Sequence, residues 1–339
     1  MKIYYDADAD IKHLEKEIVG IIGYGIQGRA HALNLRDSKV NVLVSNRKDE
    51  YYDQAVKDGF EVYPADELAK KSSIIMMLIP DQSHKHVFEQ FVKPNMKEGS
   101  MLVVAHGYSI RFKQVVCKDN ADAILLAPRF PGGVLRENFL KNKGTLAFFD
   151  VFNDFTKSAE KRGLALAKAV GYTQGGLIRV SLKEETEVDL FIEQFLIPSF
   201  LNTIQTGFDV LVENGYTPEV ALMELYQSGE IIGLLSEGRK MGMYKAFHKN
   251  TSPTCQFGVK ESFDRIITKE SRETAKRILE EIRNGDFTKR LEREEKAGYR
   301  TLKAFNQKNA ENKFSKTQEK FSNKLQNTKD RLEFVRSGA

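Results

Sequence analysis

Short runs of apolar, mostly β-branched residues recur along the first half of the chain. The run at 17–23 ends in glycine and is followed by residues 26–35, whose apolar positions have helical spacing. This order predicts a strand, a tight turn and a helix. Further runs predict strands at 40–44, 74–79, 101–105, 123–127 and 145–149, separated by amphipathic segments such as 84–91 and 159–170. Alternating strands and helices predict an α/β Rossmann domain with a doubly wound, mainly parallel sheet.

The pattern changes after residue 176, where long helical periodicities replace the strands. They predict an all-α domain, with helices at 186–200, 204–214, 218–235 and 270–284. Pro218 stands in the first turn of the third helix, a position that favours proline. We therefore predict three parts: an NAD(P)-binding Rossmann domain at 1–181, a helical domain at 182–310 and a basic polar tail at 311–339.

The composition is that of a globular chain with a local charge excess. Its 339 residues are 41% hydrophobic and 29% charged, which suffices for about two domains. The formal charge of +5 comes from residues 301–339, with nine Lys and Arg against four Asp and Glu, while the first 300 residues balance at 43 against 43. This tail lacks the interleaved aromatic and arginine side chains of nucleic-acid binders, so we expect a solvated extension and no nucleic-acid partner.

Membrane and secretion signals are not expected either. No apolar run approaches the ~18 residues of a membrane span, and residues 1–10 are acidic, unlike a signal peptide. The two cysteines, Cys117 and Cys255, are too few for a disulfide framework and lack metal-binding spacing. We expect a cytoplasmic protein with no membrane partner.

A glycine-rich turn directly after the first predicted strand indicates a dinucleotide site. Its GxGxxG sequence comprises Gly23, Tyr24, Gly25, Ile26, Gln27 and Gly28. The first glycine permits the sharp turn, the second lets a pyrophosphate approach the backbone, and the third lets helix and strand pack closely. The N-terminus of the following helix supplies free N–H groups for the phosphates. A glycine-rich turn without a ligand is the alternative.

The residues after the second predicted strand bear on the choice between NADP and NAD. Arg47 and Lys48 favour a 2′-phosphate, whereas Asp49 and Glu50 oppose one through like-charge repulsion. We expect NADPH as the cofactor, with NADH as the alternative.

Two further segments carry candidate chemistry. His106 follows a predicted buried strand, so it should lie at the carboxyl edge of the sheet, where open α/β folds bind ligands. Asp189 and Glu193 are spaced i, i+4 on one face of a predicted helix, and two such carboxylates repel each other unless a cation lies between them. A loop histidine without function and a solvated acidic pair are the alternatives.

Together these segments identify a family. The motifs GYGIQGRAHALNLRDS (23–38), LIPD (78–81), AHGYSI (105–110), APRFPGG (127–133), KEETEVDLFIEQ (183–194) and LVENGYTPEVALMEL (211–225) closely resemble short-form ketol-acid reductoisomerase. The resemblance implies a knotted helical second domain and a homodimer whose active sites use both chains. It also implies NADPH, two Mg²⁺ ions and a small-molecule substrate. The family reaction shifts an alkyl group in an acetohydroxy acid and then reduces the resulting 2-keto acid.

The resemblance also implies roles for individual residues. Asp189 and Glu193 match the first metal-binding pair, and Glu224 matches a metal-binding glutamate given by the partner chain. The predicted catalytic residues are His106, Arg129, Glu193 and Ser252, of which Ser252 matches the serine that binds the substrate carboxylate if a few residues are inserted before it. Beyond the glycine turn and His106, the predicted cofactor contacts are Arg47, Lys48, Pro80, Asp81, Gln82 and Gly132.

Three positions depart from the family pattern. Arg129 stands where the family has lysine, Gly133 where it has histidine, and Ser228 where it has a second partner-chain glutamate. An arginine cannot exchange protons as a lysine can. Loss of a carboxylate at Ser228 weakens a site for hard divalent ions, so we expect one Mg²⁺ rather than two.

These departures give three readings of function. The first is a reductase of a small carboxylate-bearing ketone or imine in which the isomerase step is impaired or lost. The second is a working ketol-acid reductoisomerase of branched-chain amino-acid synthesis. The third is a nucleotide-binding protein without catalytic activity.

Overall fold

The computed structural model describes residues 1–326 and divides into two compact units, residues 1–189 and the residues from 190 onward. The division falls inside α8 (Leu182–Phe191), the helix that begins at the predicted boundary. Residues 327–339, the end of the predicted tail, lie outside the described residues. Most of the described part of that tail is the helix α17 (Lys313–Gln326).

The first unit is built on one eight-stranded sheet with the order β1-β8-β7-β6-β5-β4-β2-β3. Neighbouring strands are parallel except at β6 with β7 and β1 with β8. The predicted mainly parallel, doubly wound sheet is confirmed. The strands are β1 (Ile3–Tyr4), β2 (Ile18–Ile22), β3 (Asn41–Ser45), β4 (Ile74–Met77), β5 (Met101–Val104), β6 (Asp122–Pro128), β7 (Ala147–Asn153) and β8 (Leu177–Arg179). The sequence did not reveal β1 and β8, because two or three residues are too few to show a period.

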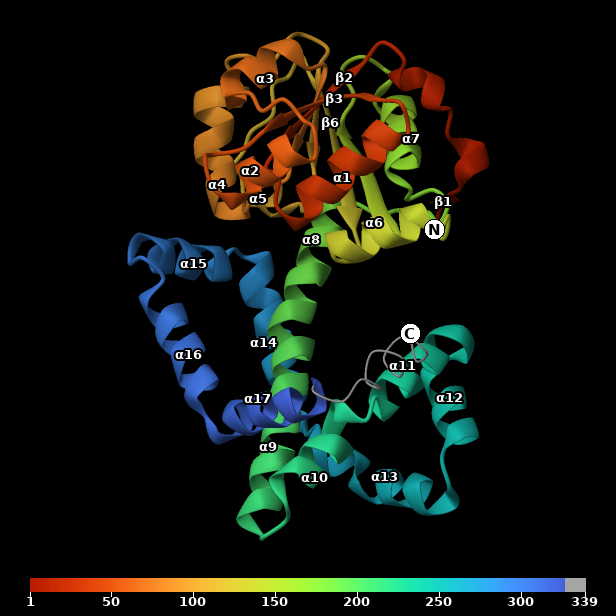
Figure 1. Cartoon of the computed structure of the whole chain (residues 1–339), viewed down its shortest axis with the longest axis vertical. Coiled ribbons are helices and arrows are strands. Elements are labelled where there is room, and N and C mark those ends of the chain that lie inside the picture. The colour runs from red at the N-terminus through yellow and green to blue at the C-terminus, as the bar shows by residue number, and fades with distance from the viewer. Residues whose placement is uncertain (327–339) are drawn as a thin grey trace. The chain divides into compact units, whose positions relative to one another are not determined.

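Both faces of the central strands are buried, so the sequence of each of these strands is a continuous run of apolar residues. Ile74 and Met76 of β4 pack in the core with α1 (Ile26–Asp37) and α7 (Ala159–Val170), while Ile75 and Met77 pack with α3 (Ala65–Lys71) and the π-turn η3 (Phe88–Val92). The helices thus lie on the two opposite faces of the sheet (Figure 1). The other helices of this unit are η1 (Asp6–Asp8), η2 (Ile11–Leu14), α2 (Glu50–Lys57), α4 (Asp81–Val87), α5 (Tyr108–Arg111) and α6 (Gly132–Leu140).

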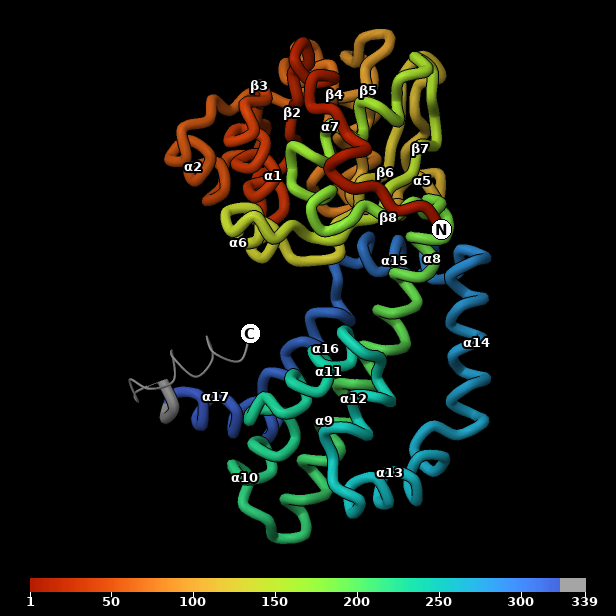
Figure 2. The backbone as a smooth tube through the Cα atoms, turned by 90° about the vertical axis from the view of Figure 1, so that its right-hand side faces the viewer, coloured from red at the N-terminus to blue at the C-terminus, as the bar shows by residue number. Residues whose placement is uncertain are grey.

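The second unit is helical throughout its described residues, as predicted (Figure 2). Its buried core is small: Phe208, Ala221 and Leu222 are buried, and Phe314 and Phe321 pack against them. The helices are α9 (Ile197–Glu213), α10 (Pro218–Leu222), the π-turn η5 (Met223–Gln227), α11 (Glu230–Met241), α12 (Met243–Asn250), α13 (Pro253–Ile266), α14 (Lys269–Arg283), α15 (Asp286–Lys296), α16 (Arg300–Glu311) and α17. The knot implied by the family resemblance stays a prediction.

Two predicted helix boundaries are wrong. The helices predicted at 186–200 and 204–214 form one continuous helix, Leu182–Glu213. It contains a short π-helix, η4 (Ile192–Leu196), just before Pro198. Proline has no backbone N–H, so regular α-helical hydrogen bonding is not possible there. The helix predicted at 218–235 is interrupted at Gly229, whose φ of 84° ends one helix and starts the next.

A buried histidine in α1 makes stability depend on pH. The imidazole of His31 donates from Nδ1 to the Gln27 carbonyl at 2.7 Å and accepts at Nε2 from the Tyr172 hydroxyl at 2.8 Å. Burial lowers the pKa of His31 to about 4, from an ordinary value of 6.5. Between these two pH values the unfolded chain binds a proton that the folded chain does not, so the folded state loses stability as the pH falls.

We predict that replacing His31 by glutamine removes this pH dependence. Between pH 7 and pH 4.5 the wild type should lose roughly 2 to 3 kcal/mol more free energy of unfolding than His31→Gln does. Urea denaturation of both proteins at the two pH values measures the difference in free energy of unfolding. The contributions of the carboxylates to the pH dependence are the same in both proteins and cancel. Equal losses would show that His31 is already protonated, or exposed, in the folded protein.

Candidate functional site

Four loops of the first unit meet at the carboxyl edge of the sheet. The glycine turn follows β2, the LIPD segment follows β4, His106 follows β5 and Arg129 follows β6. The chain order reverses at β2, which pairs with β3 on one side and β4 on the other. Ligands of open α/β sheets bind at such a switch point, so the fold brings the predicted residues of this unit to the expected place.

The glycine turn has the shape of a pyrophosphate cradle. Gly23 has a φ of 100°, and a Cβ there would lie 2.6 Å from the Leu78 carbonyl oxygen. A Cβ on Gly28 would collide with the Gly23 carbonyl, whereas one on Gly25 would meet nothing within 4 Å. Two glycines are therefore required by the fold, and Gly25 is left facing open space at the N-terminus of α1. The residues present fit a dinucleotide.

A pocket of about 380 Å³ opens beside this turn. Its wall includes Ile26 and Gly132, both predicted cofactor contacts, and Gly133. Gly132 packs so closely on the backbone of Ile26 that a side chain would not fit there. Gln27 donates from Nε2 to the Phe130 carbonyl at 2.9 Å and so ties α1 to the 127–133 segment.

Tyr24 supports the turn through its hydroxyl, which donates to Asp58 at 2.9 Å. Asp58 also accepts two hydrogen bonds from Arg29, and these bonds hold the pKa of Asp58 at about 2. Burial raises the pKa of Tyr24 far above its ordinary value. Tyr24 is therefore a neutral structural donor, and its ring packs edge-on against Phe60 at a centroid distance of 5.7 Å.

The residues after β3 are arranged around Asp49. Its carboxylate caps α2 by accepting from the Tyr51 N–H at 3.0 Å, and it also accepts from Asn46 at 2.8 Å and from Arg47 at 2.7 Å. The hydrogen bond from Arg47 lowers the pKa of Asp49. Arg47 and Lys48 are exposed. Of the two acidic side chains that would oppose a 2′-phosphate, Asp49 is thus engaged, whereas Glu50 is exposed and lines the pocket.

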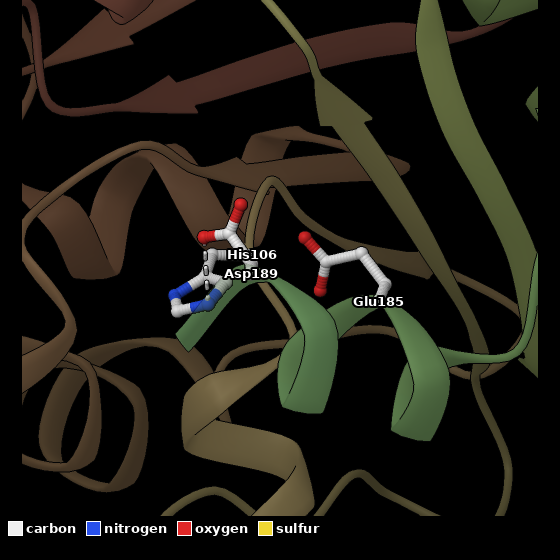
Figure 3. A group of neighbouring side chains, drawn as sticks. All are labelled: His106, Glu185 and Asp189. Carbon is white, nitrogen blue, oxygen red and sulfur yellow. Dashed lines mark ion pairs between the residues drawn. The ribbon is translucent and has the colours of Figure 1, made fainter. Parts of the chain in front are cut away.

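His106 is held from one side of its ring. Its Nδ1 lies 2.7 Å from Asp81 Oδ2. On the other side of the ring, Nε2 lies 3.6 Å from Asp189 Oδ2, the ion pair drawn in Figure 3. Nε2 is buried without a hydrogen-bond partner among the described residues. Burial alone lowers the pKa of His106, but the hydrogen bond to Asp81 and the surrounding carboxylate charges raise it to about 9. The ring is therefore charged at neutral pH, with an Nε2–H group that can donate.

Arg129 lies between two carboxylates of α8. Its Nη1 donates to Asp189 Oδ1 at 2.7 Å, and its Nη2 donates to Glu185 Oε1 at 2.9 Å. Its Nε donates to the Pro128 carbonyl at 3.0 Å, and the guanidinium carbon lies 4.7 Å from the centroid of the Phe148 ring. These contacts fix the orientation of the guanidinium.

Glu185 is the site residue that the sequence analysis missed. Its side chain is fully buried, and its Oε2 accepts from the Gly107 N–H at 3.0 Å. Burial raises the pKa of Glu185, while the positive charges of His106 and Arg129 oppose the shift. Glu185 and Asp189 have the same i, i+4 spacing that drew attention to Asp189 and Glu193. The signal was therefore present in the sequence, but nothing in it showed that Glu185, in the first turn of this helix, is buried.

The other predicted residues flank Asp81 or lie in the second unit. Pro80 precedes α4 as its N-cap, and Gln82 is exposed in the first turn of that helix. Glu193 lies in η4, Glu224 in η5, and Ser252 is the N-cap of α13, where its hydroxyl accepts from the Cys255 N–H at 3.3 Å. The roles of these residues stay predictions.

The first unit alone does not fit Mg²⁺. His106, Glu185 and Asp189 offer ligand atoms within 4.8 Å of one another, and Figure 3 shows the three side chains together. However, one of these atoms is an imidazole nitrogen, and Mg²⁺ prefers an octahedron of oxygens. Both carboxylates also bind Arg129 already.

Comparison with known proteins places the chain in a family. Residues 13–176 match the family model described as acetohydroxy acid isomeroreductase, NADPH-binding domain, and residues 182–327 match that of ketol-acid reductoisomerase, C-terminal domain. The structure is similar to that of an NADH-preferring ketol-acid reductoisomerase from an uncultured archean, at 31% identity and a TM-score of 0.89. That match covers 95% of this chain and 99% of the other.

More distant structures share the fold alone. A semialdehyde dehydrogenase NAD-binding protein from Cupriavidus necator is 16% identical with a TM-score of 0.61, covering 79% of this chain and 99% of its own. A pyrroline-5-carboxylate reductase from Coxiella burnetii is 16% identical with a TM-score of 0.55, covering 80% and 97%. Because the two family models span most of its length, this chain belongs to the ketol-acid reductoisomerase family and is an NAD(P)H-dependent oxidoreductase.

Proposed function

We propose that the chain reduces a small ketone or imine that bears a carboxylate, and that the isomerase step of its family is impaired or lost. The observation that carries this proposal is Arg129, ion-paired to Asp189 and Glu185 at the centre of the site. A guanidinium stays protonated above pH 12, so it can hold an oxyanion or a carboxylate but cannot exchange protons as a lysine can. Ser228, in place of a family glutamate, supports the same conclusion.

The residues of the site suit hydride transfer. That reaction needs an oriented nicotinamide, a polarised C=O or C=N bond and a proton source. NADPH supplies the hydride when it is bound. His106 holds the proton on Nε2, Asp81 fixes the ring through Nδ1, and Arg129 presents a permanent positive charge. The alkyl shift instead needs two adjacent oxygens polarised by metal Lewis acids, and the departures fall on that half of the reaction.

The cofactor we propose is NADPH, with NADH bound more weakly. Arg47 and Lys48 are exposed beside the turn and can bind a 2′-phosphate. The carboxylate of Asp49 caps α2 and accepts a hydrogen bond from Arg47. The similar archaean enzyme prefers NADH, so membership of the family does not by itself decide the preference.

We also propose a homodimer with shared active sites. The helix Leu182–Glu213 is long and apolar enough to cross a bilayer by length and composition, and only 6% of its most apolar window is buried within the chain. The helix begins in the first unit, where Arg129 binds Glu185 and Asp189, and these charged contacts would be costly inside a bilayer. We therefore propose that a second copy of the chain buries the exposed apolar residues of this helix, which are Val188, Ile192, Leu196, Ile197, Phe200, Leu201 and Val210. Light scattering measures the mass, and a monomer at micromolar concentration would contradict the dimer.

The first prediction from this proposal concerns Gly25. Because a methyl group there meets no protein atom, Gly25→Ala should fold normally and yet lose most of its affinity for NADPH, since the methyl group occupies the path of the pyrophosphate. Nucleotide titration followed by fluorescence measures the affinity, and thermal unfolding reports the fold. Gly233→Ala, in α11 of the second unit, also meets no protein atom and is the matched control. Unchanged affinity in Gly25→Ala would refute the assignment of the turn.

A second prediction concerns cofactor choice. Arg47→Ala should remove most of the preference for NADPH over NADH, a loss of about 1.5 to 3 kcal/mol for a hydrogen bond to a charged group. Comparison of Kd for both nucleotides in both proteins measures it. A wild type that prefers NADH would show that Asp49 and Glu50 decide the preference instead.

The central prediction compares substrates. The wild type should convert acetolactate very slowly or not at all, yet oxidise NADPH with a ready-made 2-keto acid or a cyclic imine, and it should do so with little dependence on Mg²⁺. Absorbance at the NADPH band follows both reactions. Robust Mg²⁺-dependent conversion of acetolactate at about 1 to 10³ per second would establish a working ketol-acid reductoisomerase. Cofactor binding without oxidation by any substrate would favour a catalytically idle protein.

The double variant Arg129→Lys with Ser228→Glu extends the same test. It restores the ammonium and the carboxylate of the family, so some isomerase turnover should return. Gly133 and the insertion before Ser252 still differ, and geometric errors near 1 Å can cost about 100-fold, so recovery is expected to be partial.

A further inference from the structure

We propose that Arg129 is a built-in cation of this site and that a divalent ion can bind Asp189 only by displacing it. The inference rests on the proposed function and gives it a physical cause, competition between a guanidinium and a metal for the same oxygens. This competition is distinct from the loss of a metal ligand at Ser228. It predicts that the cation site at Asp189 is still present and is blocked by Arg129.

The carboxylate oxygens of the cluster are already used. Asp189 Oδ1 and Glu185 Oε1 accept from Arg129 at 2.7 and 2.9 Å. Glu185 Oε2 accepts from the Gly107 N–H at 3.0 Å and from Thr186 Oγ1 at 3.3 Å. The fourth oxygen, Asp189 Oδ2, faces His106 Nε2 at 3.6 Å. A metal ion needs several of these atoms at once, so it must break the contacts of Arg129 to bind.

The guanidinium is also fixed in its place. Its Nε–H bonds the Pro128 carbonyl, and its face lies on Phe148. Because it is charged at every physiological pH, it neutralises the buried carboxylate of Glu185 permanently. A buried carboxylate without a counter-charge is strongly unfavourable. Removal of Arg129 therefore leaves a place that attracts another cation.

The ligand atoms predict which cation would enter. One imidazole nitrogen and carboxylate oxygens suit Mn²⁺ and similar transition ions better than Mg²⁺. His106 has the arrangement that metal-binding histidines commonly have, with Nδ1 bonded to the carboxylate of Asp81 and Nε2 buried without a hydrogen-bond partner among the described residues. Nε2 must release its proton to the solvent when the cation binds.

Calorimetric titration of the full chain, freed of metal with EDTA, tests the proposal with Mn²⁺ as the probe. The wild type should show no binding that depends on Asp189. Arg129→Gln should gain one site per chain with affinity raised by at least about 100-fold, since a unit charge a few ångströms from a dication has been removed. In that variant alone, Mn²⁺ should raise the unfolding temperature, and His106→Asn added to it should abolish the gain.

Arg179→Gln is the matched control. Arg179 also pairs with two carboxylates, Asp150 at 3.2 Å and Glu160 at 3.8 Å, and its guanidinium carbon lies 5.3 Å from the centroid of the Phe149 ring. It should gain no Mn²⁺ site. If Arg129→Gln does not fold, Arg129→Met replaces it, because methionine is also unbranched and uncharged and should give the same gain.

Two results would overturn the proposal. One is saturable Mn²⁺ or Mg²⁺ binding by the wild type that disappears in Asp189→Asn. The other is a folded Arg129→Gln that binds NADPH but gains no Mn²⁺ site. Reduction of a 2-keto acid by the wild type in EDTA tests the proposed function separately, so either claim can fail while the other stands.

Discussion

Glu185 places a carboxylate where water does not reach it, and the arrangement of the site follows from that buried charge. A buried carboxylate requires hydrogen bonds and a counter-charge. The Gly107 N–H, which belongs to the loop after β5, supplies one bond, and Arg129, which follows β6, supplies the positive charge. The same guanidinium binds Asp189 one helical turn later. One requirement of electrostatics thereby joins two loops of the sheet to the start of the long helix.

The nucleotide side of the site depends on a different constraint, which is steric. The sheet reverses its order at β2, and the turn that follows must pass close to both the LIPD segment and α1. Gly23 and Gly28 satisfy this constraint because any side chain there would strike a backbone carbonyl. The turn is therefore set by the fold before any cofactor binds, and the positive charge of His106 lies at the same edge, in the loop after β5.

The second unit differs from the first in how it is stabilised. The first unit buries apolar residues on both faces of a sheet, whereas the second buries few side chains and leaves apolar residues of α9 and α13 exposed, among them Phe200, Phe257 and Phe263. Exposed apolar patches of this kind mark interaction surfaces. The dimer that we propose would supply the missing burial, and it would also bring residues of a second chain to each site.

The sequence by itself determined the fold class, the glycine turn, the edge of the sheet that carries the site, and the positions at which the chain departs from its family. These features follow from local periods and from residue types with few structural roles, such as glycine at positive φ. It did not determine that Arg129 spans two carboxylates, that Glu185 belongs to the site, or that Asp81 holds His106. Those contacts join residues 25 to 60 positions apart. Only the tertiary structure decided these contacts, because burial and the distance between two charges depend on which loops meet at the sheet edge. A local sequence pattern does not show which loops meet.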